Sequence, residues 1–293
     1  MEQLGIVKLS PSIGAEITGF DAQAPIEDHD WKLLSRTFDE CAMLAFRDID
    51  LSVSKQHQIV EILHASGDVS AIDGIDTESF SYVSNKEEDG GAPYGRLLFH
   101  SDMMWSQLPN QTPSLFAVDA QQPSTPTIFT SVVNAWKTLP EDLKERLKGL
   151  TVRHESGQQG RGDTDFEDQL IQPQWGKLHD TVTPITMRHP RTGETMLYIC
   201  EQQTREIVGL PKQESNALLD QLFEHMYRPE VVIAHQWRKG DFVIWDNMIA
   251  QHGRPFVKGG GSARTLRKIH APYSAIKSYI SQMGGAPTYE KAM

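Results

Sequence analysis

The amino-acid sequence predicts a mainly β fold with a few flanking helices. Most apolar runs are short, and residue clusters that favour turns separate them. Only a few segments have the spacing of an amphipathic helix. At 293 residues the chain is long enough to bury a large core in one domain. Many short strands with flanking helices are typical of a double-stranded β-helix, a cupin-like jelly roll. We therefore expect residues 1–293 to form one such domain.

The first half of the chain is expected to begin with a hairpin and two helices. Residues 4–20 alternate in polarity and contain turn residues, which indicates a β-hairpin. Apolar residues recur at helical spacing over Glu27–Phe46 and over Ser54–Ala65, and Ser52 or Ser54 is a suitable N-cap for the second helix. Strands are then expected over three segments: Leu97–Asp102, Ser114–Val118 and Thr127–Val133.

The second half is expected to alternate helices with strands. Trp136–Leu150 and Gln213–Tyr227 have the pattern of amphipathic helices. Between them, Glu155–Lys177 is polar and rich in Gly, Gln and Asp. A loop of this length is either a lid that excludes water from a site or a plain surface loop. Val231–Trp237 and Asp241–Asp246 are predicted to be paired strands joined by a short turn.

Composition limits the functional classes. The net charge is −11 and the isoelectric point is about 5.4, which argues against a nucleic-acid partner, because phosphate binding needs a basic face. Two cysteines, Cys41 and Cys200, do not form a disulfide framework and suit a reducing compartment. The N-terminus has no secretory signal pattern, and no apolar run is long enough to span a membrane. These features predict a cytoplasmic protein without a membrane partner.

Two short motifs suggest a metal site. His100 and Asp102 are two residues apart, so both side chains face one side if the segment is extended. His252 follows 152 positions later (252 − 100) and Arg267 another fifteen (267 − 252). Two imidazoles and one carboxylate form the facial triad of non-haem Fe(II) oxygenases, and an arginine suits a carboxylate co-substrate. Trp105, just past this motif, is expected either to form a pocket wall or to pack in the core.

Several segments in order along the chain resemble the taurine dioxygenase and 2,4-dichlorophenoxyacetate dioxygenase family of Fe(II)/2-oxoglutarate enzymes. They are Ser12–Asp21, Ala45–Asp48, His100–Asp102, Pro126–Ser131, Ala135–Leu147, Arg188–Tyr198, Trp245–His252 and Arg267–His270. The resemblance implies the double-stranded β-helix fold, with Fe(II), 2-oxoglutarate and O₂ as cofactor and co-substrates. It also implies that Fe(II) is bound by His100, Asp102 and His252.

The resemblance further assigns residues to 2-oxoglutarate. Arg267 matches the arginine that pairs with its distal carboxylate, although the assignment could slip by three residues to Arg264. Thr127 matches the threonine that hydrogen-bonds the keto-acid end. Because relatives often form dimers or tetramers, a homo-oligomer is also expected.

Departures from the family pattern concern the substrate. Ala271 stands where taurine dioxygenase has a sulfonate-binding arginine, four residues after the co-substrate arginine. Ser70, Gln203 and Arg96 stand where that enzyme has a histidine, an aromatic residue and an asparagine. Taurine is therefore not the expected substrate. Arg96 or Arg254 remains as a partner for another anion.

The expected reaction is hydroxylation of an unactivated C–H bond of a small anionic or polar molecule, with release of succinate and CO₂. The Asp102 carboxylate favours hydroxylation, since related halogenases lack this ligand. The same cofactors also perform desaturation or ring closure, which the sequence does not distinguish. Two other readings stay open: a different metal enzyme on the same fold, and a non-catalytic jelly-roll binding protein.

Overall fold

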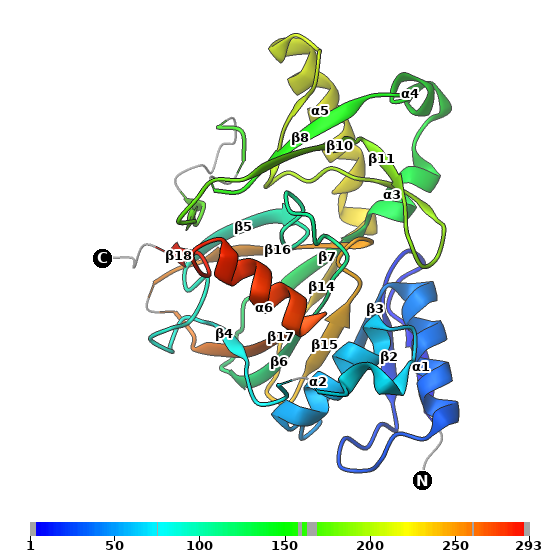
Figure 1. The fold of residues 1–293 in the computed structure, drawn as a ribbon, viewed down its shortest axis with the longest axis vertical. Helices are drawn as coiled ribbons and strands as arrows, with labels where there is room; N and C mark the ends of the chain where they lie inside the picture. The colour runs from blue at the N-terminus through cyan, green and yellow to red at the C-terminus, as the bar shows by residue number, and fades with distance from the viewer. Residues whose placement is uncertain (1–3, 75, 158–159, 163–168, 260, 290–293) are drawn as a thin grey trace.

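The structure is a computed structural model that describes residues 4–74, 76–157, 160–162, 169–259 and 261–289. Two β-sheets form its centre (Figure 1). The larger sheet has the order β1 (Gly5–Lys8), β2 (Ala15–Thr18), β3 (Met43–Phe46), β15 (Phe242–Trp245), β6 (Thr112–Ala120), β17 (Arg264–Ala271) and β4 (Ser81–Ser84). The smaller sheet has the order β14 (Ile233–His235), β7 (Thr127–Ser131), β16 (Ala250–Val257) and β5 (Gly95–His100). The prediction of a mainly β fold is confirmed.

Smaller strand groups lie beside these sheets. One group joins β10 (Asp180–Pro184), β8 (Thr151–Glu155) and β13 (Thr204–Ile207). A hairpin joins β11 (Thr186–Arg188) to β12 (Thr195–Leu197), and a two-stranded ribbon joins β18 (Thr288–Tyr289) to β9 (Pro173–Gln174). The ribbon connects segments that are more than a hundred residues apart in the sequence.

The predicted N-terminal hairpin is confirmed, but the prediction that Val231–Trp237 pairs with Asp241–Asp246 is wrong. β14 pairs with β7, whereas β15 pairs with β3 and β6 in the other sheet. Gly240, at φ 83°, turns the chain between the sheets, and its N–H donates to the Ala117 carbonyl. Alternating polarity identified the strands, but it carries no information on which strands become neighbours.

Two helices cover the N-terminal side of the larger sheet. α1 (Asp28–Cys41) and α2 (Val53–His64) bury Leu34, Phe38 and Ile59 against Phe46 and other core residues. The predicted first helix ends early, because Ala42 adopts a left-handed φ of 58° and the chain then enters β3. Ser52 caps α2 as predicted, by accepting a hydrogen bond from the Lys55 N–H.

The helix predicted over Trp136–Leu150 is divided in two. α3 (Val132–Thr138) and α4 (Glu141–Arg146) are separated at Leu139–Pro140, where Leu139 is extended with ψ 135°. The residue before proline avoids the helical region, which accounts for the break. α5 (Lys212–Met226) forms within a residue of its predicted bounds. Short 3-10 turns lie at Val69–Ile72 and Pro229–Val231.

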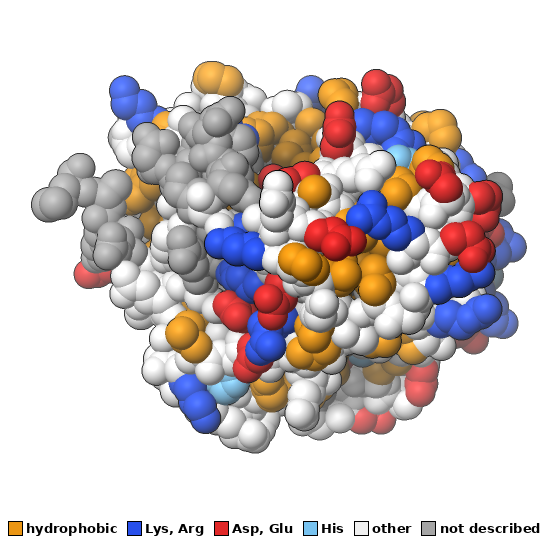
Figure 2. Space-filling view, turned by 90° about the horizontal axis from the view of Figure 1, so that it is seen from above, with side chains coloured by type: hydrophobic (Ala, Val, Ile, Leu, Met, Phe, Trp, Pro, Cys, Tyr) orange, Lys and Arg blue, Asp and Glu red, His pale blue; other side chains and the backbone are white. Residues whose placement is uncertain are grey.

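The last helix, α6 (Tyr273–Gln282), is red in Figure 1 and packs beside β17. No helix among the described residues is long and apolar enough to cross a membrane. Basic and acidic side chains are interspersed on the face drawn in Figure 2. Ion pairs on α4 and just after it, Lys144–Glu141 and Lys148–Glu145, follow this mixed pattern.

Candidate metal centre and active-site pocket

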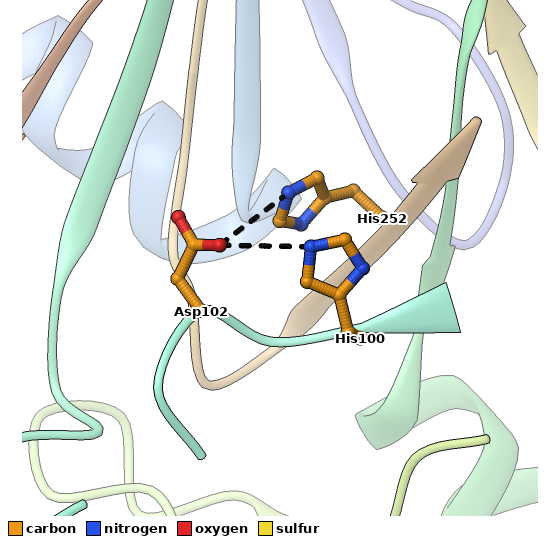
Figure 3. Close-up of side chains that lie close together, drawn as sticks. All are labelled: His100, Asp102 and His252. Atoms are coloured by element: carbon orange, nitrogen blue, oxygen red, sulfur yellow. Dashed lines mark ion pairs between the residues drawn. The ribbon is translucent and has the colours of Figure 1, made fainter. Parts of the chain in front are cut away.

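Strand pairing brings the two predicted histidine ligands together. His100 ends β5 and His252 lies on β16, and the two residues are direct partners in the antiparallel ladder. Their ring centroids are 4.1 Å apart. Asp102 Oδ1 lies 3.6 Å from His100 Nε2 and 3.9 Å from His252 Nε2, so all three side chains converge (Figure 3). Their ligand atoms all lie within 4.8 Å of one another.

Asp102 reaches this cluster from a turn, which corrects the expectation that it shares a strand with His100. β5 ends at His100, and Met103 has a left-handed φ of 55°. The Asn247 side chain fixes the turn: its Oδ1 accepts from the Asp102 N–H at 2.8 Å, and its Nδ2 donates to the Asp102 carbonyl at 2.9 Å. Asn247 also donates to the Pro109 carbonyl and is fully buried. It therefore ties the first ligand motif to the segment that leads into the second.

The charges suit a divalent cation. Burial acts to raise the pKa of the Asp102 carboxyl, but Lys268, His100 and His252 hold it well below its ordinary value. Lys268 Nζ lies 2.6 Å from Asp102 Oδ2, which leaves Oδ1 facing the histidines. Burial and the neighbouring His100 keep the pKa of His252 well below its ordinary value, so this ring is neutral. An ionised carboxylate and a neutral imidazole are the protonation states that metal binding requires.

His100 is oriented for the same task. Its Nδ1 lies 2.8 Å from the Leu98 carbonyl, which fixes that nitrogen as the donor and leaves Nε2 to face Asp102. Metal-binding histidines usually donate their second ring nitrogen in this way. The donor set of two imidazoles and one carboxylate thus fits a non-haem Fe(II) site.

The three side chains line a cavity of about 310 Å³. Ligand pockets range from about 300 to 1,000 Å³, so this cavity suits small molecules. Five of the other residues singled out in the sequence also line it: Thr127, Trp105, Gln203, Arg254 and Arg264. Arg267, Arg96 and Ser70 do not line it.

The two arginines of β17 face opposite sides of the sheet. Arg264 faces the cavity, where it donates to the Thr125 carbonyl and burial lowers its pKa to about 10, so it stays charged. Arg267 faces α2 instead, and its Nε donates to Gln56 Oε1 at 2.8 Å. Side chains alternate along a strand, so a shift of three residues changes the face. The structure therefore brings Arg264, and not Arg267, to the cavity that holds the metal cluster.

The two candidates for the substrate anion, Arg254 and Arg96, and the substrate candidate Ser70 also need correction. Arg254 is buried in the cavity wall, but its guanidinium donates to the carbonyls of Ala92, Tyr94 and Gly95. Arg96 lies on β5 outside the cavity lining. Ser70 is exposed on a 3-10 turn, where its hydroxyl donates to Asp68. None of these side chains presents a group to an anion beside the metal cluster.

Thr127, Gln203 and Trp105 line the cavity in buried positions. Thr127 is buried, and its Oγ1 accepts a hydrogen bond from the Trp237 indole N–H at 2.9 Å. This leaves the threonine hydroxyl proton to donate to a ligand. Gln203 donates to the Ser101 carbonyl, and Trp105 packs edge-on against Trp175 at 5.1 Å.

The predicted lid segment Glu155–Lys177 is only partly described. Its two ends line the cavity, through Glu155–Gly157 on one side and Pro173 and Trp175 on the other. Residues 158–159 and 163–168 lie outside the described residues. Closure of a lid over the cavity stays a prediction.

Several residues of the cavity lining or beside the metal cluster were missed from the sequence. Lys268 and His270 share the cavity face of β17 with Arg264, and counting in twos from Arg264 would have found both. Asn247 follows Asp246 in the second ligand motif, but its contact with Asp102 depends on the fold. Tyr289 lies far from both motifs, and no sequence signal points to it.

Comparison with known proteins agrees with this geometry. A family model described as taurine catabolism dioxygenase TauD, TfdA family, matches residues 6–270. The chain belongs to this family. TauD, TfdA family enzymes use Fe(II), 2-oxoglutarate and O₂, so the predicted family, enzyme class and cofactors are confirmed.

Individual relatives of this family are distant. Pentalenolactone F synthase of Streptomyces arenae is 30% identical over 187 residues, 59% of this chain and 62% of the relative. The alpha-ketoglutarate-dependent 2,4-dichlorophenoxyacetate dioxygenase of Cupriavidus pinatubonensis is 26% identical over 83% of this chain and 89% of its own length. A solved taurine dioxygenase structure from Burkholderia xenovorans has a TM-score of 0.71, with 23% identity, over 91% of this chain and 90% of that one. This last similarity concerns the fold alone.

Proposed function

We propose that this TauD, TfdA family enzyme hydroxylates an unactivated C–H bond of a small anionic molecule, with Fe(II) held by His100, Asp102 and His252. The observation that carries the proposal is the convergence of these three groups within 4.8 Å at one cavity. Three protein ligands leave positions on the metal for co-substrate and O₂. When bound, Fe(II), 2-oxoglutarate and O₂ together supply the oxidation that converts C–H to C–OH and releases succinate and CO₂.

We propose that Arg264 and Thr127 hold 2-oxoglutarate. Among the described residues, the Arg264 guanidinium donates to the Thr125 carbonyl, which leaves most of its five N–H donors for a carboxylate. The Thr127 hydroxyl donates towards the same ligand, because the Trp237 indole already occupies one of its lone pairs. Trp245 and Leu266 give this part of the cavity apolar surface that excludes water.

Lys268 is proposed to hold the anionic group of the substrate. It lines the cavity, and its side chain is 25% exposed. Counting four residues from Arg264 rather than Arg267 places the sulfonate-binding position of taurine dioxygenase at Lys268 instead of Ala271. The ammonium group of a lysine is a compact charge that does not require the bidentate hydrogen-bond geometry of arginine. It therefore accommodates a carboxylate as well as other monoanions.

We also propose that the two sheets form a double-stranded β-helix within one domain. Successive strands β14, β15, β16 and β17 alternate between the smaller and the larger sheet, which is typical of a jelly roll. The residues that line the cavity come from positions between Ser81 and Tyr289, and this wide range supports a single domain. The expected homo-oligomer stays a prediction.

The proposal is tested by anaerobic absorption of the purified protein during titration with Fe(II) and then 2-oxoglutarate. A metal-to-ligand charge-transfer band is expected only with both, and it should be absent from His252→Ala. The matched control is His29→Ala, a histidine that is exposed on α1. A band that survives in His252→Ala, or its absence from folded wild-type protein, would contradict the ligand assignment.

Two further variants test the remaining roles. In air, Asp102→Ala should abolish hydroxylation, and full activity in that variant would contradict its place as a ligand. Lys268→Met removes the ion-pair partner of Asp102 as well as the proposed anion contact, so the anaerobic band should shift and added carboxylates should no longer perturb it. Unchanged perturbation would remove Lys268 from the substrate site.

A further inference from the structure

The residues after position 270 form one wall of the cavity. The family match ends at residue 270, and the following segment contains α6 and β18. Ile280, Ala286, Pro287 and Tyr289 of this segment line the same cavity as the metal cluster. The cavity therefore lies between the ligand-bearing strands and a segment outside the matched region.

α6 is fixed to the turn that carries Asp102. Ile276 of α6 and Met283, the residue just after it, are buried in a cluster with Met103 and Trp105, which lie within three residues of Asp102. The Tyr273 N–H at the start of α6 donates to Glu61 Oε1 at 2.8 Å, which connects the helix to α2. The position of α6 is thus set by buried contacts on both sides.

The end of the segment is fixed to the predicted lid. Thr288 and Tyr289 pair with Gln174 and Pro173 in the β18–β9 ribbon. The next lid residue, Trp175, packs against Trp105. Asp102 and Arg254 are both near enough to Tyr289 to influence its pKa, which burial raises to about 12. The segment therefore spans the cavity from α6 to the neighbourhood of the metal cluster.

The chemistry of this wall differs from that of the strands opposite. The strands contribute the ionisable side chains of His100, His252, Arg264 and Lys268 among apolar ones, whereas Ile280, Ala286 and Pro287 are apolar and Tyr289 is the one polar residue of this wall in the described cavity lining. Met103, Trp105 and Trp175 beside them add further apolar surface. A substrate held at Lys268 would place its uncharged portion against this wall. Ile280 is a flexible aliphatic side chain at the wall, so its size limits the space available.

We infer that residues 271–289 set the size limit of the substrate's apolar portion, with Ile280 as a specificity-determining residue. The inference rests on the proposed function, because it takes the metal cluster and Lys268 as the fixed end of the substrate site. One methylene group in an apolar pocket changes binding by about 10- to 200-fold. Changes at Ile280 should therefore alter which acids bind and leave 2-oxoglutarate binding unchanged.

The test uses the full chain with Fe(II) and 2-oxoglutarate under anaerobic conditions. Acetate, butanoate, hexanoate and octanoate are the probes, and perturbation of the charge-transfer band gives each dissociation constant. Ile280→Phe is expected to raise the dissociation constant of the longest acid that wild type binds by at least about tenfold. Ile280→Ala is expected to improve binding of the next longer acid. Acetate and 2-oxoglutarate should be unaffected by both changes.

One control and one further wall variant separate this effect from general damage. Ala275→Phe places the same bulk on α6 at an exposed position and should behave as wild type. Tyr289→Leu changes the wall at β18 and should also shift the chain-length preference. It replaces either Ile280 variant as the test if that variant fails to fold. Thermal unfolding of each variant confirms that it is folded.

The outcomes are distinct. A wild-type band that no acid perturbs, or an unchanged chain-length profile in folded Ile280→Phe and Tyr289→Leu, overturns the inference but leaves the metal and 2-oxoglutarate assignments intact. A wild-type protein without any band overturns those assignments as well as the inference.

Discussion

The two faces of β17 carry one arginine each, and the two side chains have different environments. Arg264 faces the cavity and is buried, with the Thr125 carbonyl as its acceptor. Arg267 donates to Gln56 and to the Leu51 carbonyl, and its guanidinium lies 4.7 Å from the Phe116 ring centroid. The same residue type therefore offers free donors on one face and satisfies buried acceptors on the other. The alternation of side chains between the two faces of a strand decides which of the two arginines is available to a ligand.

Arg264→Leu should produce the largest effect. Removing one partner of a buried, hydrogen-bonded charge pair costs about 2–5 kcal/mol, so the Michaelis constant for 2-oxoglutarate should rise at least about 30-fold. Steady-state measurement of succinate release against 2-oxoglutarate concentration checks this, with Arg267→Met as the matched control. A larger rise in Arg267→Met than in Arg264→Leu would reverse the assignment of the two faces.

Arg267→Met should instead reduce stability. It leaves Gln56 Oε1 and the Leu51 carbonyl without their charged donor, and a buried polar group without a partner costs about 1–3 kcal/mol. Urea unfolding should show a lower midpoint with an unchanged slope. The band formed with Fe(II) and 2-oxoglutarate should persist once the protein is folded. Wild-type stability in this variant would mean that neither contact contributes to folding.

Asn247→Asp should have an intermediate effect on the metal site, because the Asn247 side chain positions Asp102 through hydrogen bonds to its backbone. The change replaces a donor that faces the Asp102 carbonyl with a second acceptor, which moves the turn. Loss of a group that positions a metal ligand costs about 10- to 100-fold in metal affinity. Titration with Co(II), followed by visible absorption, measures this effect. Asn134→Asp on α3 is the control, and equal Co(II) affinity in both variants would assign Asn247 a structural role alone.

The smallest expected effect concerns His270, on the cavity face of β17. Burial, and then Lys268, lower its pKa to about 3. Between pH 6.5 and 3 the unfolded chain binds a proton at this ring that the folded protein does not, so stability falls as the pH decreases. The contribution is at most about 1.4 kcal/mol per pH unit. Urea unfolding at about pH 7.5 and about pH 5.5 should show a smaller loss in His270→Gln than in wild type. An identical loss in both proteins would mean that His270 is protonated within the fold.

The sequence was sufficient for the parts of the site that depend on short motifs. His100 lies on a strand that its apolar pattern predicted, His252 was found through its ligand motif, and the ladder places the two opposite each other. The sequence was not sufficient to tell which side chains of β17 face the cavity, because two arginines three residues apart both follow the second motif. The structure decides between them through the contact of Arg267 with Gln56 on α2.

Long-range contacts explain the remaining differences. Val231–Trp237 and Asp241–Asp246 are strands as predicted, but their partners come from segments more than a hundred residues away. The cavity wall at Ile280 and Tyr289 contains no metal-binding or co-substrate motif. It becomes part of the site only because α6 packs on Met103 and Trp105.

The β18–β9 ribbon also has a consequence for biosynthesis. Its two strands pair Pro173–Gln174 with Thr288–Tyr289, near opposite ends of the second half of the chain. Translation proceeds from the N-terminus at about 5–20 residues per second, and all three metal-binding candidates emerge before residue 288. The three candidates are therefore synthesised before β18, and the β18–β9 ribbon is the last of the described strand pairs that can form.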